Sequence, residues 1–234
     1  MRVSSKPLKT YYQAGLDYLD NSEYGEGEKI GSTILGLEEV YDIHDDPDVI
    51  LFMGGTDISP HLYGEKPLST TQKSNIERDA KEVYDYNMGL ELGTVNVGIC
   101  RGAQLLNVMN GGKLWQHVTD HRGNHPVTVR GPDKYQHYIQ TLSSDHHQLI
   151  IPPRNGNEKH NPFTIVAEAS VKPKHWFNNA KERNVPRVEV EGIWFPNTQS
   201  LGVQWHPGWD DPSAKALHDL WKWYVEKLVV SCVA

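Results

Sequence analysis

The stretch Val97-Gly98-Ile99-Cys100-Arg101-Gly102-Ala103-Gln104 is the most informative part of this chain. A strand-like apolar segment leads into it, a helix-like segment leaves it, and a cysteine stands between two glycines at the junction. This G-x-C-x-G order is typical of a nucleophile elbow, a tight strand-to-helix turn that exposes one reactive side chain. Glycines permit the turn and a close approach of substrate. A helix N-terminus stabilises a thiolate. The stretch therefore predicts that Cys100 is a nucleophile.

Strand-like and helix-like segments alternate on either side of the elbow. Residues 49–53 form an apolar run that ends at Gly54-Gly55, which indicates a buried strand followed by a turn. Helical spacing of apolar residues predicts helices over residues 77–92, 103–109 and 214–230. Strands are predicted over residues 94–99, 126–130, 164–169, 187–195 and 201–205. Most of the remaining chain between residues 143 and 186 is rich in Pro, Asn, Lys and His, and we expect irregular loops there.

This order predicts an α/β fold with a mostly parallel sheet flanked by helices on both faces. The chain shows no internal repeat, low-complexity tract or linker. We therefore expect one domain over residues 1–234, which is long enough to bury a sizeable core.

Composition narrows the class of protein. The formal net charge of −7 over 234 residues argues against a nucleic-acid or anionic-membrane binder, which needs a basic face. No apolar stretch approaches the roughly 18 residues that span a bilayer, and the first residues lack the apolar core of a secretory signal. With Cys100 and Cys232 as the two cysteines, no disulfide framework is expected. These features favour a cytoplasmic protein whose thiol stays reduced.

A cysteine nucleophile needs a base that can also protonate the leaving group, usually a histidine. His206 is the best of twelve candidates, because it follows an apolar strand and active sites of open α/β sheets lie at the carboxyl ends of strands. Backbone donors must also stabilise the oxyanion. Gly54, Gly55 and the N–H of Arg101 occupy suitable places for that role.

Four segments, in order, resemble one known family. They are Leu51-Phe52-Met53-Gly54-Gly55-Thr56-Asp57-Ile58-Ser59-Pro60, the elbow from Gly98 to Gln104, Ser144-Asp145-His146-His147-Gln148, and Gly202-Val203-Gln204-Trp205-His206-Pro207. Together they resemble the gamma-glutamyl-gamma-aminobutyrate hydrolase-like branch of the class I glutamine amidotransferases. The resemblance covers residues from about 50 to 210. The first 45 residues do not share it.

The resemblance implies the three-layer, flavodoxin-like architecture of class I glutamine amidotransferases and cleavage of a small γ-glutamyl amide through a thioester on Cys100. It also implies that Gln104 contacts the glutamyl group, and Ser144 and His146 belong to the substrate-binding segment. No cofactor is required, because the cysteine carries the covalent chemistry. The separate histidines His117, His121, His125 and His137 lack the spacing of a structural zinc site, so no metal is expected.

One position departs from the family pattern. The family usually continues His-Pro-Glu, with the glutamate orienting the histidine, but this chain has His206-Pro207-Gly208. Asp210 is the nearest replacement acid, and Glu189 and Glu191 on the preceding strand are further candidates. Otherwise Cys100 and His206 would work as a dyad.

Two other functions remain open at this level. The chain could be a glutaminase subunit that delivers ammonia to a separate synthetase or ligase, or a catalytically weak relative that serves as a binding or regulatory subunit. Arg78 and Asp79 are expected in a salt bridge, either structural or at the pocket edge. Tryptophans of the last helix, if exposed, would suit a homodimer contact. The residues do not identify the group attached to the γ-carbonyl.

Overall fold

The computed structural model describes residues 9–12, 21–72, 74–133, 136–153, 162–169, 175–177, 180–181 and 188–226. The α-helices are α1 (Asn21–Glu28), α2 (Ile76–Leu92), α3 (Arg101–Met109) and α4 (Asp211–Leu220). Short π-helical segments, η1 (Lys29–Ile34) and η5 (Trp221–Val225), continue α1 and α4, respectively. Short 3-10 turns are η2 (Ile43–Asp45), η3 (Pro60–Tyr63) and η4 (Pro196–Thr198).

The strands run in chain order as β1 (Lys9–Tyr12), β2 (Glu38–Val40), β3 (Val49–Phe52), β4 (Val95–Ile99), β5 (Lys113–Trp115), β6 (His117–Val118), β7 (His125–Arg130), β8 (His137–Leu142), β9 (Leu149–Ile151), β10 (Thr164–Ala169), β11 (His175–Phe177), β12 (Ala180–Lys181), β13 (Glu189–Phe195) and β14 (Ser200–Val203). The expected strands and helices at and after the elbow are all present, with ends shifted by a few residues. Their order gives the predicted α/β class.

The main sheet has the strand order β2-β1-β3-β4-β14-β13-β10-β7-β8. Pairing is parallel from β2 to β14 and antiparallel from β14 to β8. The sheet is thus mixed, and parallel pairing is confined to one half. The parallel half arises where helices return the chain between strands, whereas β7 and β8 are joined by a short connection that allows only antiparallel pairing.

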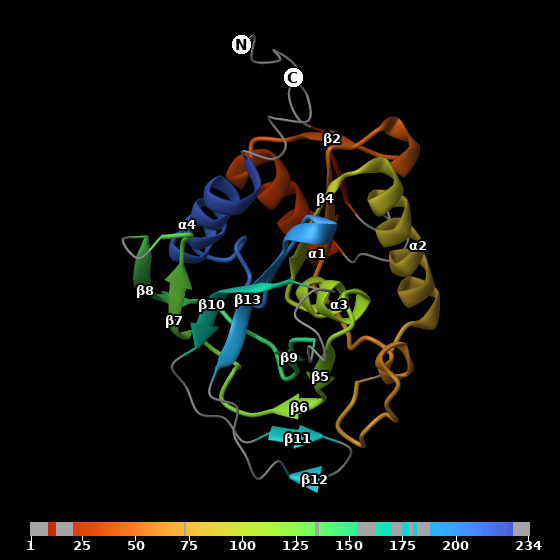
Figure 1. The fold of residues 1–234 in the computed structure, drawn as a ribbon, viewed down its shortest axis with the longest axis vertical. Coiled ribbons are helices and arrows are strands. Elements are labelled where there is room, and N and C mark those ends of the chain that lie inside the picture. The colour runs from red at the N-terminus through yellow and green to blue at the C-terminus, as the bar shows by residue number, and fades with distance from the viewer. Residues whose placement is uncertain are drawn as a thin grey trace.

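Two apolar layers cover the parallel half of the sheet. Val49 and Leu51 of β3 pack in one cluster with Ile30 and with apolar residues of α4 and η5. Ile50 and Phe52 pack in another, with Tyr86 of α2 and with Leu105 and Leu106 of α3. Alternate residues of one strand therefore face opposite helical layers, as the strand period requires. Figure 1 shows α2 and α4 on opposite sides of the sheet, which confirms the three-layer arrangement.

The region between residues 143 and 186 is more regular than expected. Besides the predicted β10, it contains β9, which pairs with β5 and β13, and β11 and β12, which form a small second sheet with β6. Strands as short as two or three residues carry too few alternations to give a periodic signal. In Figure 1 the small sheet lies at the end of the molecule opposite β2.

The last helix also differs from expectation. The tryptophan at its end, Trp221, is 3% exposed and belongs to the core, and Trp223 is partly buried. These residues therefore do not offer the exposed aromatic face that we expected for a dimer. Cys232 and the end of the predicted helix lie outside the described residues. Within the described ranges, no helix combines the length and apolarity needed to cross a membrane.

Candidate active site

Cys100 occupies a strained turn between β4 and α3. Its φ of 51° and ψ of −105° lie in a region that non-glycine residues seldom adopt. The backbone N–H of Cys100 donates to the carbonyl of Val203 at 2.8 Å, which ties the turn to β14. A Cβ on Gly102 would lie 1.9 Å from the carbonyl oxygen of Phe52, and one on Gly98 would lie 2.5 Å from the backbone of Gly102. The two glycines therefore allow strand and helix to pack closely enough to form the elbow.

His206 follows β14, the strand beside β4, so parallel pairing brings it next to Cys100. Both side chains line the same cavity, and a Cβ placed on Gly54 would lie 3.2 Å from Cε1 of His206 and 3.8 Å from Cβ of Cys100. Ser143 fixes the histidine backbone, because its Oγ donates to the His206 carbonyl at 2.8 Å. The indole of Trp209 stacks on the imidazole with ring centroids 4.0 Å apart and planes 13° from parallel. The ring is thus held from several sides.

The acid beside His206 comes from the far N-terminal part of the chain. Oε2 of Glu26, in α1, lies 3.0 Å from Nδ1 of His206, and Oε1 accepts the backbone N–H of Gly208 at 3.3 Å. A Cβ on Gly208 would lie 2.6 Å from Cγ of Glu26. The glycine that removes the usual acid therefore also makes room for another one, and Lys29 donates to the Gly208 carbonyl at 2.6 Å.

None of the acids proposed from the sequence contacts His206. Asp210 is the N-cap of α4, where its carboxylate accepts the backbone N–H of Ser213 at 2.8 Å. Capping satisfies a helix donor that would otherwise lack a partner. Glu191 lies among buried histidines, and Glu189 is two residues before it on β13. Asp210 as the orienting acid is therefore corrected to Glu26.

The site favours a protonated histidine. Burial alone would lower the pKa of His206, but its interactions with Cys100 and Glu26 outweigh that effect and raise the pKa to about 10. A carboxylate beside the ring stabilises the imidazolium. At neutral pH the imidazole of His206 therefore carries a proton that it can donate.

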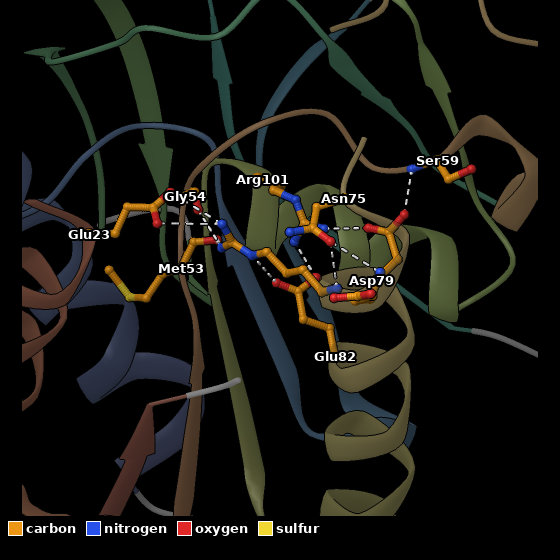
Figure 2. A network of polar contacts seen from close by, with 10 residues as sticks. Glu23, Met53, Gly54, Ser59, Asn75, Asp79, Glu82 and Arg101 are labelled. Carbon is orange, nitrogen blue, oxygen red and sulfur yellow. Dashed lines mark hydrogen bonds and ion pairs between the residues drawn. The ribbon is translucent and has the colours of Figure 1, made fainter. Parts of the chain in front are cut away.

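A buried ionic network supports the turn after β3. The guanidinium of Arg78 donates to the Gly54 carbonyl at 2.6 Å and to Glu82 at 2.9 Å, and it pairs with Glu23 at 3.3 Å. The Arg101 side chain pairs with Glu82 and Asp79. Figure 2 shows these groups joined in one network beside Gly54. Arg78 and Asp79 thus each take part in a salt bridge, Asp79 with Arg101, and Glu82 is shared between the two arginines.

This network also settles where Arg101 points. Its side chain is 2% exposed and directed toward α2, so the backbone N–H is the part of Arg101 available to the pocket. As the first residue of α3, Arg101 has an N–H without a partner inside the helix. Gly54 and Gly55 line the same cavity. These are the three places expected for oxyanion donors.

A cavity of about 310 Å³ opens over the cysteine. Gln104 and His146 line it, as the resemblance implied, whereas Ser144 does not. The Ser144 hydroxyl instead donates to the carbonyl of His121 at 2.6 Å and supports the loop behind the wall. His147 also lines the cavity, and its Nε2 lies 2.8 Å from Oδ1 of Asp57.

Sequence reasoning missed Glu26 for a physical reason. It lies 180 residues from His206, in a segment without a family motif, and no local spacing connects the two. The signal that existed was Gly208, which indicates that an acid must arrive from elsewhere. It does not indicate which of the thirty acids arrives.

Comparisons with known proteins agree with this geometry. Residues 35–208 match the family model described as Peptidase C26. The glutamine amidotransferase-like protein YvdE of Lactococcus lactis is 30% identical over 176 residues, which are 68% of this chain and 65% of that protein. The gamma-glutamyl-gamma-aminobutyrate hydrolase of Escherichia coli O157:H7 is 27% identical over 165 residues, 66% of this chain and 61% of the hydrolase. The matched part thus spans less than two thirds of either relative.

Two further proteins match this chain over similar shares of both chains. Protein NtpR of Enterococcus hirae is 29% identical over 189 residues, which are 78% of this chain and 76% of NtpR. The structure of PurLQS from Thermotoga maritima superposes with a TM-score of 0.56 at 12% identity and covers 93% of this chain and 99% of that one. At such low identity the likeness shows the fold alone. The family match over most of the chain and the ordered motifs lead to one conclusion: this chain belongs to the Peptidase C26 family, within the glutamine amidotransferase-like group.

Proposed function

We propose that this protein hydrolyses a γ-glutamyl amide by covalent catalysis on Cys100. The observation that carries the proposal is the strained elbow at Cys100, which lines one cavity together with His206, whose Nδ1 is 3.0 Å from Glu26. A nucleophile, a base and an orienting acid in this relation are the parts that acyl transfer needs. The hydrolase relative from Escherichia coli supports the choice of the γ-glutamyl class.

In the first half of the reaction, the Cys100 thiolate attacks the γ-carbonyl carbon and a C–S bond forms. The N–H of Arg101 and the amide of Gly54 or Gly55 stabilise the oxyanion. The His206 imidazolium gives its proton to the departing amine nitrogen as the C–N bond breaks. A γ-glutamyl thioester and neutral His206 remain.

In the second half, neutral His206 takes a proton from water, which attacks the thioester carbonyl. The C–S bond breaks, the thiolate–imidazolium pair is restored, and the γ-carboxylic acid that forms gives its proton to solvent and leaves as the carboxylate. Glu26 keeps Nδ1–H of the imidazole directed toward itself, so that Nε2 faces the reacting atoms in both halves. Cys100 must stay reduced for this cycle, which suits a reducing compartment such as the cytoplasm.

Charges at the rim support a glutamyl substrate. Arg122 and Asp145 both line the cavity, lie 3.7 Å apart, and are 62% and 56% exposed. A free γ-glutamyl group carries an α-carboxylate and an α-ammonium on one carbon, which present the opposite pair of charges. We assign Arg122 to the carboxylate and Asp145 to the ammonium, with Gln104 along the side chain of the substrate.

Labelling with a diazo-ketone analogue of glutamine tests the proposal. We expect one label per chain on Cys100, with loss of dinitrogen, and no label in Cys100→Ser. The matched control Cys232→Ser should be labelled like the wild type. Folded wild-type protein that takes no label would contradict the proposal and favour a binding or regulatory subunit.

A substrate screen then identifies the leaving group. Glutamine and a series of γ-glutamyl amines and peptides are offered to the wild type and to Cys100→Ser, and released glutamate is measured. We expect Cys100-dependent release from at least one compound. Labelled protein that cleaves only when a synthetase or ligase partner is added would instead indicate an ammonia-delivering subunit.

A further inference from the structure

Three histidines and a glutamate form a buried cluster behind the pocket wall. Nε2 of His121, His125 and His146 lies 3.2, 3.3 and 3.4 Å, respectively, from Oε1 of Glu191. All four residues are at most 5% exposed. They come from three separate parts of the chain: the segment before β7 and its first residue, the segment before β9, and the middle of β13. The mechanism proposed above uses none of them as a reacting group.

The cluster holds polar atoms that its hydrogen bonds do not satisfy. Among the described residues, Nε2 of His121, Nε2 of His146 and Oε2 of Glu191 have no hydrogen-bond partner of acceptable geometry. The two nitrogens are close to Oε1 of Glu191, but the oxygen lies off the direction in which a ring N–H would point. Buried polar atoms without partners cost free energy. The described side chains therefore leave these three buried polar atoms without a hydrogen-bond partner.

The other ring nitrogen of each histidine is anchored to the backbone. Nδ1 of His121 lies 3.3 Å from the Thr119 carbonyl, and Nδ1 of His125 lies 3.3 Å from the Gly123 carbonyl. Nδ1 of His146 lies 2.9 Å from the Gln148 carbonyl and 3.1 Å from Nε2 of Gln204. An imidazole that keeps its proton on Nδ1 presents a lone pair at Nε2. Histidine ligands of metals are oriented in this way, with the second nitrogen donating to a carbonyl or carboxylate.

The distances match the edges of a coordination tetrahedron. Zinc lies about 2.0–2.2 Å from nitrogen and oxygen ligands, so two ligands of a tetrahedral ion are about 3.3–3.4 Å apart. The three measured separations fall at or within about 0.2 Å of that length. The ligand atoms of His121, His125 and Glu191 all lie within 4.8 Å of one another. Nε2 of His125 forms a hydrogen bond with Oε1 of Glu191 at 3.3 Å, whereas Nε2 of His121 and of His146 lie close to that oxygen without an aligned hydrogen bond.

We propose that His121, His125 and Glu191 form a binding site for one divalent transition-metal ion, with Zn²⁺ as the preferred ion. Imidazole nitrogen suits Zn²⁺, whereas Mg²⁺ and Ca²⁺ prefer sites made of oxygen ligands. Three protein ligands leave the fourth position of a tetrahedral ion to water, and Nε2 of His146, 3.4 Å from Oε1 of Glu191, lies beside the site. The inference is independent of the proposed hydrolysis, whose reacting groups are elsewhere.

The site would stabilise the wall of the catalytic cavity. The segment of His121 already joins the segment of His146 through backbone hydrogen bonds, from Gly123 N to Ser144 O at 2.8 Å and from His146 N to His121 O at 3.3 Å. A metal would tie the His121 segment, and through these bonds the His146 segment, to β13. Arg122 and Asp145, which line the cavity, follow His121 and precede His146 directly. Metal removal is therefore expected to weaken substrate binding more than it slows the chemical step.

The spacing of these residues along the chain contains no zinc motif. His121 and His125 are four residues apart, and His146 and Glu191 follow 21 and 66 residues after His125. A ligand set assembled from separate strands and loops has no short motif. Only the fold brings the four side chains together.

The test measures bound metal in the full-length chain. The background is Cys100→Ala, because the catalytic thiol and His206 are themselves possible zinc ligands. The protein is stripped with a chelator, dialysed against a small excess of Zn²⁺ and analysed by mass spectrometry for metal per chain. We expect about one Zn²⁺ per chain, and about one Co²⁺ with the visible absorption of a tetrahedral site when Co²⁺ is used instead.

Variants locate the ion. His121→Asn and His125→Asn, each in the same background, should lose at least about nine tenths of the bound metal, and His137→Asn, an exposed histidine, should retain it. Zn²⁺ should also raise the thermal midpoint of the Cys100→Ala protein and of its His137→Asn derivative, but not of the two ligand variants. Circular dichroism checks that each variant folds.

Two results would overturn the proposal. One is a folded Cys100→Ala protein that binds less than about one tenth of an equivalent of either metal, which would identify the cluster as a network of histidine–glutamate ion pairs. The other is metal retained by both ligand variants. If neither ligand variant folds, the Zn²⁺-dependent thermal shift and the Co²⁺ spectrum of the Cys100→Ala protein decide between the two explanations.

Discussion

The proposed nucleophile, Cys100, and the proposed orienting acid, Glu26, belong to two parts of the molecule that are built differently. The elbow at Cys100 is built from adjacent residues of one strand and one helix, buried between layers, with glycine contacts that leave no space for a methyl group. Glu26 comes from α1, a short helix 180 residues from its histidine partner. The first part belongs to the core of the fold, whereas the second docks against it. Damage to the elbow should therefore affect folding, and damage at Glu26 should affect the rate.

Gly102→Ala should have the largest effect. The added Cβ would meet the Phe52 carbonyl at 1.9 Å, a backbone atom that cannot move without separating α3 from β3. We expect a loss of at least about 3 kcal/mol in the free energy of unfolding, measured with urea, or failure to fold. Gly123→Ala is a control for glycine replacement at an open position with strained φ. Normal stability of Gly102→Ala would show that the elbow is less tightly packed than described.

Glu26→Gln should lower kcat/KM by about 10²-fold or more while leaving the fold intact. The amide can no longer stabilise the imidazolium as a charge, and it can select the wrong tautomer of His206. Steady-state release of the amine measures the effect. Glu28→Gln, on an exposed position of the same helix, should match the wild type. An unchanged rate in Glu26→Gln would mean that Cys100 and His206 act as a dyad.

Gly208→Ala should have a similar but smaller effect, because its Cβ would meet Cγ of Glu26 at 2.6 Å and displace the acid. We expect a loss of about tenfold in kcat/KM. Gly25→Ala serves as the matched control. It places a methyl group on α1, the helix of Glu26, at a position with nothing within 4 Å.

The double variant Glu26→Ala, Gly208→Glu sharpens this comparison. It moves the carboxylate to the position at which the family usually carries it, two residues after the histidine. If Gly208 and Glu26 are alternative ways to place one acid, the double variant should be more active than Glu26→Ala alone. Lower activity than the single variant would show that the backbone at Gly208 cannot place a carboxylate against His206.

Stability should fall as the solution becomes alkaline. The pKa of His206 is raised from 6.5 to about 10, so the folded chain holds this proton more tightly than the unfolded chain. The resulting stabilisation is complete below about pH 6.5 and is lost as the pH rises toward about 10. Urea unfolding at several pH values measures it. Glu26→Gln should show a shallower fall, and an equal fall in both proteins would argue against the contact between Glu26 and His206.

Asp210→Ala should have the smallest effect on catalysis. It removes the cap of α4 and should cost about 1 kcal/mol in the free energy of unfolding. The rate of amide cleavage should stay within about twofold of the wild type, because Asp210 does not contact His206. A large loss of rate without loss of stability would restore Asp210 as the orienting acid.

The sequence by itself determined the α/β class, the elbow at Cys100, His206 as the candidate base, and the family. Each of these depends on residues that are close together in the chain. Glycines beside Cys100 restrict the local backbone directly, and short apolar runs mark buried strands. It also showed, through Gly208, that the usual acid was missing. A mostly parallel sheet was predicted, and parallel pairing holds for the half in which helices connect the strands.

Only the tertiary structure decided what fills that missing position and what surrounds it. Glu26 reaches His206, and Glu191 reaches its three histidines, across large sequence separations that leave no periodic or spacing signal. Asp210 was the nearest acid in sequence, but the start of α4 uses its carboxylate as a cap. Hydrogen bonds depend on distances of about 3 Å in space, and chain separation does not report such distances once the sheet and its helices have formed.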